Sequence, residues 1–414
     1  MPGSILDNQI ARAVSWLDRW TQHPSYGLTP SGIAQIYSSA EAGAPAQQCD
    51  LFDDMIERDG HLRSQLDGRL QAVMGKDWIL EGGGDSEEDA RAAVLLELAC
   101  RATPSFWQTI KHQLKDTWYG YSLSEIVWGI SDGLIVPTWF GNVPHRRVRF
   151  GDPMATSDAS SSEPRLLTKV ADTRGVALEP GRWIWGETDV PAVRAGVMRT
   201  ATWWAFFKKL SVRDWIVFSE RFGLPYVTGE YSETASDADK SALKEAVAQL
   251  GKDGAAVFAE TCKLVIHQVE RGGKAEDIQG SLTALCNAEM SKLVSGATLI
   301  SESGGPGSFA LGRVHQERSF DLIDSDAKRI ADRFADAVGK PFVVWNGLNA
   351  RPPRLRINVM RETDPLTRSK VLSTLANELG LALDEDQVRK EFSVKRPVGA
   401  ALNGTRKSSG SFAE

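Results

Sequence analysis

The stretch from Val197 to Tyr231 constrains the fold of this chain most, because it combines a long helical pattern with bulky apolar side chains. These side chains recur at helical spacing on two adjoining faces, which leaves too little polar surface for an ordinary half-exposed helix. The helix therefore lies either in the core of one subunit or between two subunits, and the second alternative implies an oligomer. One face carries Trp203, Phe206, Phe207, Leu210 and Val217, and the other carries Trp204, Trp215, Phe218 and Phe222.

The helical pattern stops before the end of this stretch. Gly223 can adopt the left-handed conformation that ends a helix, and Pro225 cannot continue one. The chain is therefore expected to turn into a short β segment from Tyr226 to Tyr231. Three basic residues of the helix, Lys208, Lys209 and Arg213, form a narrow stripe.

Length and composition indicate an ordinary globular protein. The chain has 414 residues, more than one hydrophobic core usually serves, so two or three lobes are expected. No run approaches the ~18 apolar residues that a membrane span needs, and the N-terminus lacks the pattern of a signal peptide. The sequence predicts no membrane contact, and a protein kept in the cytoplasm or in an assembly built there.

The charge balance argues against tight binding of duplex DNA. The formal net charge is −6, whereas proteins that grip DNA usually carry a basic excess. The chain could still surround DNA, because a channel through which DNA slides is better left weakly attractive or repulsive. The most basic short run, His145 to Phe150, is expected to be a solvated strand edge rather than a nucleic-acid contact.

The region from Asp50 to about Val190 is expected to form an α+β lobe. Thr21 to Ala46, before it, has no sustained period and is expected to be an irregular arm, although Ile10 to Trp20 has helical spacing. The elements expected in the lobe are two helices and a strand over Asp50–Leu80, helices over Ser86–Cys100 and Ser105–Gly120, a strand over Tyr121–Trp128 that enters a hairpin through Ser131–Gly133, and a closing segment at Trp183–Trp185.

The second half of the chain alternates long helices with short extended segments. A Gly-rich loop, Ser301 to Gly312, is expected between two of the long helices. The other elements are a polar helix over Ser236–Leu250 that ends at Gly251, strands over Ala255–Ala259 and Lys263–Val269, long helices over Asp277–Gly296 and Glu317–Val338, and two short helices over Leu366–Val394, one of them Asp384–Phe392.

One part of that loop matches a dinucleotide fingerprint. Gly305 to Ala310 reads G-x-G-x-x-A, which binds pyrophosphate only between a strand and the helix that follows it. Ala297 to Ser301 could be such a strand, but a predicted helix precedes it. A structural loop is the preferred interpretation, and a dinucleotide-binding enzyme is the alternative.

Other catalytic or metal-binding patterns are not found. The chain has no P-loop, nucleophile elbow or zinc-protease motif, and its histidines are scattered. The widely spaced cysteines predict buried free thiols. Asp321, Asp324, Asp326, Asp332 and Asp336 alternate with basic residues, so a solvated, salt-linked helix face is expected rather than a metal site. No cofactor and no metal are predicted, and the residues alone suggest a structural or assembly protein.

Several motifs in combination resemble the portal proteins of Mu-like bacteriophages and prophages. They are GLTPSGIAQIY (Gly27–Tyr37), LFDDMIERDGHLRSQLDGR, GYSLSEIVW, FFKKLSVRDWIVFSERFGLPYVTGEY and GGPGSFALGRVH (Gly304–His315). The resemblance extends roughly from Gly27 to Arg361. It implies an α+β portal fold with wing, stem and clip regions and a small C-terminal helical region.

The resemblance also implies a role. Such proteins form a ring, commonly a dodecamer, at one capsid vertex, through which DNA is packaged and later ejected, and they have no catalytic activity. The implied partners are further copies of the chain, non-specific double-stranded DNA, terminase, head–tail connector or adaptor proteins and the major capsid protein. The implied location is the virion, after assembly in the host cytoplasm. Another head or neck connector protein remains an alternative.

The elements then take places in that architecture. The expected regions are an N-terminal arm (1–49), a wing (50–196), a stem and clip (197–276), long wing helices with a channel loop (277–361) and C-terminal helices with a tail (362–414). The subunit interface would include Trp203, Trp204, Phe207, Trp215 and Phe218. The DNA-facing channel loop would include Ser301, Glu302, Ser303, Gly304, Gly305, Gly307, Ser308 and Arg313, with Lys292 nearby.

Overall fold

The computed structural model describes most of the chain: residues 23–151, 163–168, 172–222, 226–253, 262–267, 274–296, 308–359, 365–378 and 388. The chain divides into two compact units, Met1–Val359 and Met360–Glu414. The predicted helix over Ile10–Trp20 and the predicted strand over Ala255–Ala259 lie outside the described residues, as does nearly all of the predicted helix over Asp384–Phe392.

Helices open the first unit. α1 (Pro30–Glu41), α2 (Ala46–Arg58) and α3 (Gly60–Met74) precede β1 (Trp78–Glu81) and α4 (Glu87–Ala102). The prediction of an irregular segment over Thr21–Ala46 was wrong for α1, whose first turn is capped by the Thr29 hydroxyl accepting from the Gly32 N–H. Ile33 and Tyr37 of α1 are buried in the main core. Three large apolar residues, of which Ile36 is the third, fall within two turns of this short helix, which is too few for a sustained period.

A three-stranded antiparallel sheet lies at the centre of the unit. Its order is β3 (Leu134–Asn142), β2 (Tyr121–Ser131) and β7 (Trp183–Glu187). Asp132 and Gly133 connect β2 to β3 with positive φ angles of 51° and 78°, as a tight hairpin turn requires. The predicted hairpin and closing segment are therefore confirmed. α5 (Phe106–Gln113) and α6 (Asp116–Tyr119) pack against β2.

The basic run His145–Phe150 is largely buried, contrary to the prediction of a solvated strand edge. It forms η1 (His145–Arg147) and β4 (Val148–Phe150), which pairs with β5 (Pro164–Leu166) beside β6 (Val176–Ala177). Arg147 is 1% exposed, and its Nε donates to the Leu167 carbonyl at 3.1 Å. The His145 ring stacks on Tyr119 with centroids 3.8 Å apart. Long-range partners that no local pattern reveals account for this burial.

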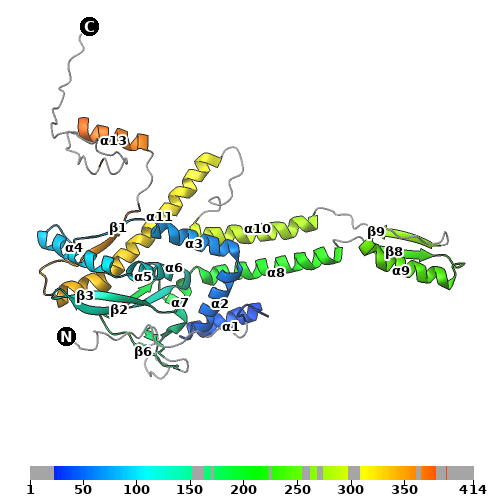
Figure 1. Cartoon of the computed structure of the whole chain (residues 1–414), viewed down its shortest axis with the longest axis horizontal. Helices are drawn as coiled ribbons and strands as arrows, with labels where there is room; N and C mark the ends of the chain where they lie inside the picture. Colours follow the sequence, from blue (N-terminus) through cyan, green and yellow to red (C-terminus); the bar gives the residue numbers. More distant parts are fainter. Residues whose placement is uncertain are drawn as a thin grey trace, which may run out of the picture. The chain divides into compact units, whose positions relative to one another are not determined.

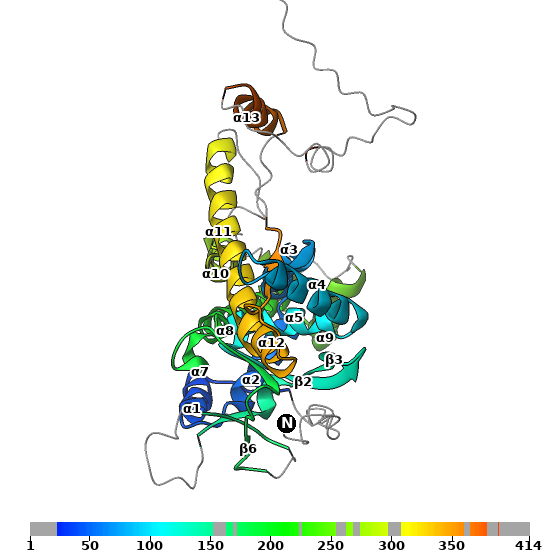
Figure 2. The same ribbon diagram turned by 90° about the vertical axis from the view of Figure 1, so that its left-hand side faces the viewer.

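Long helices complete the first unit. α7 (Ala192–Ala195) leads into α8 (Met198–Phe222), and α10 (Lys274–Ser295) lies beside α8 (Figure 1). α11 (Ser308–Phe334) runs through the π-helical turn η3 (Ala335–Gly339) into α12 (Lys340–Trp345), as Figure 2 shows. β10 (Arg354–Ile357) then pairs with β1. Because α11 begins at Ser308, the predicted loop Ser301–Gly312 was wrong for its last five residues, which are helical.

Between α8 and α10 the chain forms a small β–α–β excursion. β8 (Tyr226–Tyr231) pairs with β9 (Cys262–His267), and α9 (Asp237–Asp253) packs against both strands. Ser236 caps α9 reciprocally with Asp239, as a capping box does. The helix was predicted to stop at Gly251, but it continues for two more residues to Asp253.

The second unit contributes one described helix, α13 (Pro365–Asn377). Among the described residues, no helix is both long and apolar enough to cross a membrane. All four cysteines are free and buried, as predicted.

Buried ion pairs attach α11 to the rest of the first unit. Asp116, which is fully buried, accepts from Arg329 at 3.0 Å and from Arg333 at 2.7 Å. Asp326 is also buried and accepts from Arg69 and Arg329. The prediction of a solvated aspartate face therefore holds for the exposed Asp321, Asp332 and Asp336 and for the half-exposed Asp324, which pairs with Lys328. It was wrong for Asp326. A partner on α3, distant in the sequence, allows this carboxylate to be buried.

Two buried imidazoles generate a prediction about acid stability. His112 and His145 lie with ring centroids 4.9 Å apart, and neither Nε2 atom has a hydrogen-bond partner. Burial, with a smaller contribution from Lys115, lowers the pKa of His112 to about 4. Burial also lowers the pKa of His145 well below its usual value. Both rings are therefore neutral at neutral pH.

As the pH falls from about 6.5 toward 4, the unfolded chain takes up a proton at residue 112 that the folded chain does not, so stability is lost in that window. The variant His112→Gln cannot titrate there and can retain a backbone hydrogen bond. We expect it to reduce the loss of unfolding free energy between neutral pH and about pH 4.5 by roughly 2 kcal/mol. Urea titrations at the two pH values measure this, and an unchanged pH dependence would contradict it.

Candidate functional site

Helix α8 begins in the core and reaches the surface at Arg213. Its first turns bury Met198, Ala201 and Ala205. By contrast, all residues from Arg213 to Val217 are exposed, with Trp215 at 43% and Ile216 at 54%. Five consecutive exposed residues point to every side of a helix, so the described part of the chain leaves this turn of α8 uncovered.

Helix α10 adds to this uncovered surface. It packs on α8 and α3 through Cys286, Met290 and Val294, which recur every four residues and are completely buried. Nearer its start, Leu282 and Leu285 are exposed. The apolar residues left uncovered by the described chain, which we call the α8–α10 face, are Phe207, Trp215, Ile216, Val217, Leu282 and Leu285.

The five predicted interface residues fall into two environments. Phe207 and Trp215 are exposed on the α8–α10 face. Trp203 and Trp204 are half-buried and pack against the main core, with ring centroids 6.1 Å and 6.4 Å from that of Phe207. The side chain of Phe218 lies outside the described residues. The alternative of burial in the core of one subunit therefore holds for the start of α8, and burial between two subunits stays a prediction for its exposed residues.

The basic residues of α8 hold the helix to the N-terminal helices. Lys208 Nζ lies 2.9 Å from Asp59 Oδ1, and Asp59 also caps α3 by accepting from the Leu62 N–H. Lys209 donates to the Ser25 carbonyl at 2.8 Å. Partial burial, with a smaller contribution from Arg58, lowers the pKa of Lys209. These bonds fix the buried half of α8, and so the direction in which its exposed half leaves the core.

The predicted channel loop lies mostly outside the described residues. Ser301, Glu302, Ser303, Gly304, Gly305 and Gly307 are not described, and Ser308 and Arg313 belong to α11, where their side chains are not described. The helices on both sides are placed, because α10 and α11 each pack against α3. Lys292, on the last turns of α10, pairs with Glu289 at 2.5 Å.

Neither a dinucleotide site nor a metal site is built from the described residues. The possible strand Ala297–Ser301 lies outside the described residues. The last element described before it is helix α10 and the next is helix α11, whereas a dinucleotide fold places a strand directly before the helix. No group of three or more potential metal-ligating side chains occurs among the described residues. The sheets there are antiparallel throughout.

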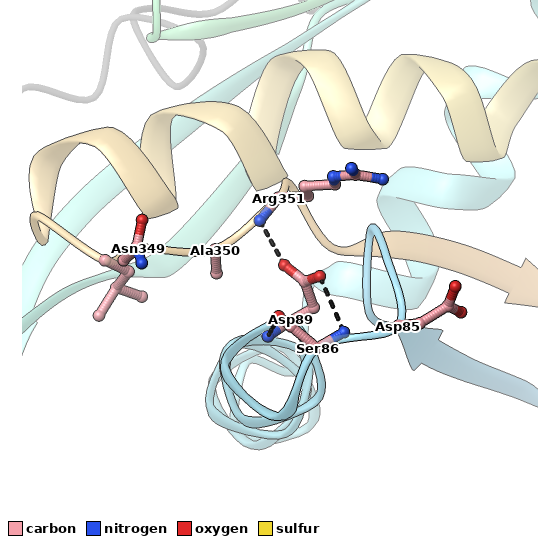
Figure 3. Close-up of a pocket in the computed structure, with 7 residues that line it drawn as sticks. Asp85, Ser86, Asp89, Asn349, Ala350 and Arg351 are labelled. Carbon is pink, nitrogen blue, oxygen red and sulfur yellow. Dashed lines mark hydrogen bonds between the residues drawn. The ribbon is translucent and has the colours of Figure 1, made fainter.

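One cavity among the described residues is lined by polar groups that hold the fold together. This cavity, of about 500 Å³, lies between the start of α4 and the loop after α12 (Figure 3). The Asp89 carboxylate accepts from the Arg351 N–H at 2.5 Å and from the Ser86 N–H at 3.3 Å. These bonds, that of Arg351 foremost, lower the pKa of Asp89. The carboxylate is thus engaged as a helix cap and a loop tether rather than poised for catalysis.

Comparison with known proteins identifies one family. The family model described as the portal protein of Mu bacteriophage matches residues 49–394. The portal protein of Escherichia phage Mu is 26% identical over 391 residues, covering 92% of this chain and 74% of that protein. The Mu-like prophage FluMu protein gp29 of Haemophilus influenzae is 27% identical over 356 residues, covering 83% of this chain and 66% of that protein.

A solved structure shows the same fold. A chain in the virion of a native gene transfer agent particle superimposes with a TM-score of 0.54 at 10% identity. The match covers 89% of this chain and 95% of that chain. At this level of identity the likeness shows the fold, and the α+β class predicted from the sequence is confirmed.

Proposed function

This chain belongs to the family of Mu bacteriophage portal proteins, and we propose that its copies form a closed ring, a dodecamer, around a DNA channel. A portal protein stands at the unique vertex of the phage capsid. The family match over residues 49–394 carries this assignment, because it covers the helices, the central sheet and the excursion between α8 and α10.

The α8–α10 face is the surface through which neighbouring copies meet. Fully burying a side chain the size of Val, Leu or Phe stabilises a contact by ~1.5–3 kcal/mol. Six large apolar side chains gather on two helices that pack together. Exposed apolar surface of this extent favours a protein interaction site, and in a ring every copy would cover that of its neighbour.

The regions of the chain take the roles that the sequence predicted. α2–α4 with the central sheet form the wing, and α10 and α11 are its long helices. α8 is the stem helix, and β8, α9 and β9 form the clip. Residues 301–307 face the DNA, because they join the end of α10 to the start of α11 and contain hydroxyl groups but a single charge, that of Glu302. Neutral donors allow contact with phosphates without tight capture.

The ring acts as a conduit and a platform rather than as an enzyme. DNA enters through it during packaging and leaves through it during ejection, while terminase supplies the motor. Head–tail connector proteins and the major capsid protein bind its outer surfaces. Assembly takes place in the host cytoplasm, and the finished ring stays in the virion. The net charge of −6 suits a channel whose DNA must remain mobile.

Assembly should fail when charge is placed on the exposed half of α8. The double variant Trp215→Glu and Ile216→Glu puts two carboxylates into the proposed contact, where burial of an unpaired charge is costly. We expect monomers by light scattering, with the circular dichroism and thermal unfolding of the free subunit unchanged. Arg213→Gln, which removes a charge at an exposed position in the same turn instead of adding one, is the control and should assemble.

A substitution at the half-buried Trp204 distinguishes an effect on folding from an effect on assembly. Because Trp204 packs against the core, Trp204→Glu should destabilise the subunit itself. Normal rings from the Trp215 and Ile216 double variant would show that the α8–α10 face is not the contact.

Shortening the proposed DNA-facing segment should affect DNA but not the ring. Replacing residues 301–307 by two glycines keeps the whole of α11, which begins at Ser308. Rings of normal size should form, while the amount of DNA packaged or retained in complemented particles falls. Substituting Ser301 and Ser303 by alanine at full length is the milder control. Normal DNA content with the shortened segment would remove this assignment.

DNA binding by the free ring should be weak and electrostatic. Any affinity for duplex DNA should show no sequence preference and should fall steeply as salt rises, since released counterions drive such binding. Fluorescence anisotropy with two unrelated duplexes over a range of salt concentrations measures this. Binding that is insensitive to salt, or selective for one duplex, would contradict it.

A further inference from the structure

A stripe of polar side chains on α3 holds the end of α10. His61, Gln65 and Arg69 are spaced four residues apart and so share one face of α3. His61 Nε2 lies 2.8 Å from Ser291 Oγ and 3.0 Å from the Asn287 carbonyl oxygen.

Gln65 and Arg69 form hydrogen bonds with the last residues of α10. The Ser295 hydroxyl donates to Gln65 Oε1 at 2.8 Å. Arg69 Nη1 donates to the Val294 carbonyl at 2.8 Å. That carbonyl belongs to the last turn of α10, where helical partners are missing and positive charge is favoured.

Arg69 bonds two helices at once. Besides the Val294 carbonyl of α10, it binds the Asp326 carboxylate of α11 through Nε at 2.8 Å and Nη2 at 3.0 Å. The side chains of Arg69 and Asp326 are only 11% and 4% exposed, so solvent screens this bidentate pair little. One guanidinium thus joins α3, α10 and α11.

A cavity beside this junction leaves part of the space between the three helices unfilled by side chains. It measures about 360 Å³ and is lined by all three helices, including Gly68 of α3, Ser295 of α10 and Leu322 of α11. A Cβ atom added at Gly68 would meet nothing within 4 Å. Where side chains do not interdigitate, directional hydrogen bonds set the separation of the helices.

We infer that Arg69 is a positioning residue that sets the separation between the end of α10 and the middle of α11. On the proposed function, these two helices carry the ends of the DNA-facing segment. Arg69 would then fix where that segment starts and finishes in every subunit, from a position on the wing helix α3. The inference on the helix separation itself depends only on described residues.

The variant Arg69→Met tests this without leaving a buried charge unpaired, because Asp326 keeps Arg329 at 3.0 Å. Arg69→Lys keeps the charge, but one ammonium cannot hold both carboxylate oxygens and the Val294 carbonyl. Arg63→Gln is the control, since Arg63 is an exposed residue of α3 whose pair with Asp67 is at the surface.

The separation can be measured between spin labels at Lys292→Cys on α10 and Lys328→Cys on α11. Both positions are exposed and the four native cysteines are buried, so labelling is selective. In rings that contain few labelled subunits, Arg69→Met should make the distance distribution roughly twice as wide, consistent with local opening. The width for Arg69→Lys should lie between those of the parent protein and Arg69→Met, and the width for Arg63→Gln should match that of the parent protein.

A distribution for Arg69→Met identical to that of the parent would overturn the inference. Packaging by the same variants separates this from the proposed function. A widened distribution with loss of packaged DNA supports both. A widened distribution with normal packaging supports the positioning role of Arg69 and counts against a DNA-facing segment between α10 and α11.

Discussion

The buried network of guanidinium and carboxylate groups along α11 is the interaction on which the first unit depends. Asp116 and Asp326 are both buried, and Arg69, Arg329 and Arg333 share them. Removing one partner from a buried pair typically costs ~3–5 kcal/mol, because a desolvated charge is left alone. The network attaches α11 to α6 on one side and to α3 on the other, so these helices keep a fixed relation.

Because the buried ion pairs keep the helices of the first unit in place, this unit can present a helix that its own described residues do not cover. α8 is anchored in the core by Met198 and Ala201, by Lys208 to Asp59 between α2 and α3, and by Lys209 to Ser25 before α1. Its outer half then carries apolar side chains into solvent beside those of α10. In a family whose members are phage portal proteins, further copies of the chain are the natural cover for this surface.

Local sequence signals predicted the elements that local interactions form. The hairpin at Asp132 and Gly133, the start of α9 near Ser236 and the length of α8 were all recognised from turn and period signals. The burial of residues whose partners are distant in the sequence was not predicted. The basic run at His145 was expected at the surface, yet it packs on Tyr119, and Asp326 was expected in solvent, yet it binds Arg69. For the candidate site, the sequence identified the helix but not which half of it is exposed.

The most direct test of a ring built through the α8–α10 face is cryo-electron microscopy of the purified full chain. We predict closed rings around a central hole, in which Trp215 and Ile216 of each subunit are covered by a neighbouring subunit. Particles that remain monomeric, or rings in which the α8–α10 face is open to solvent, would contradict the account.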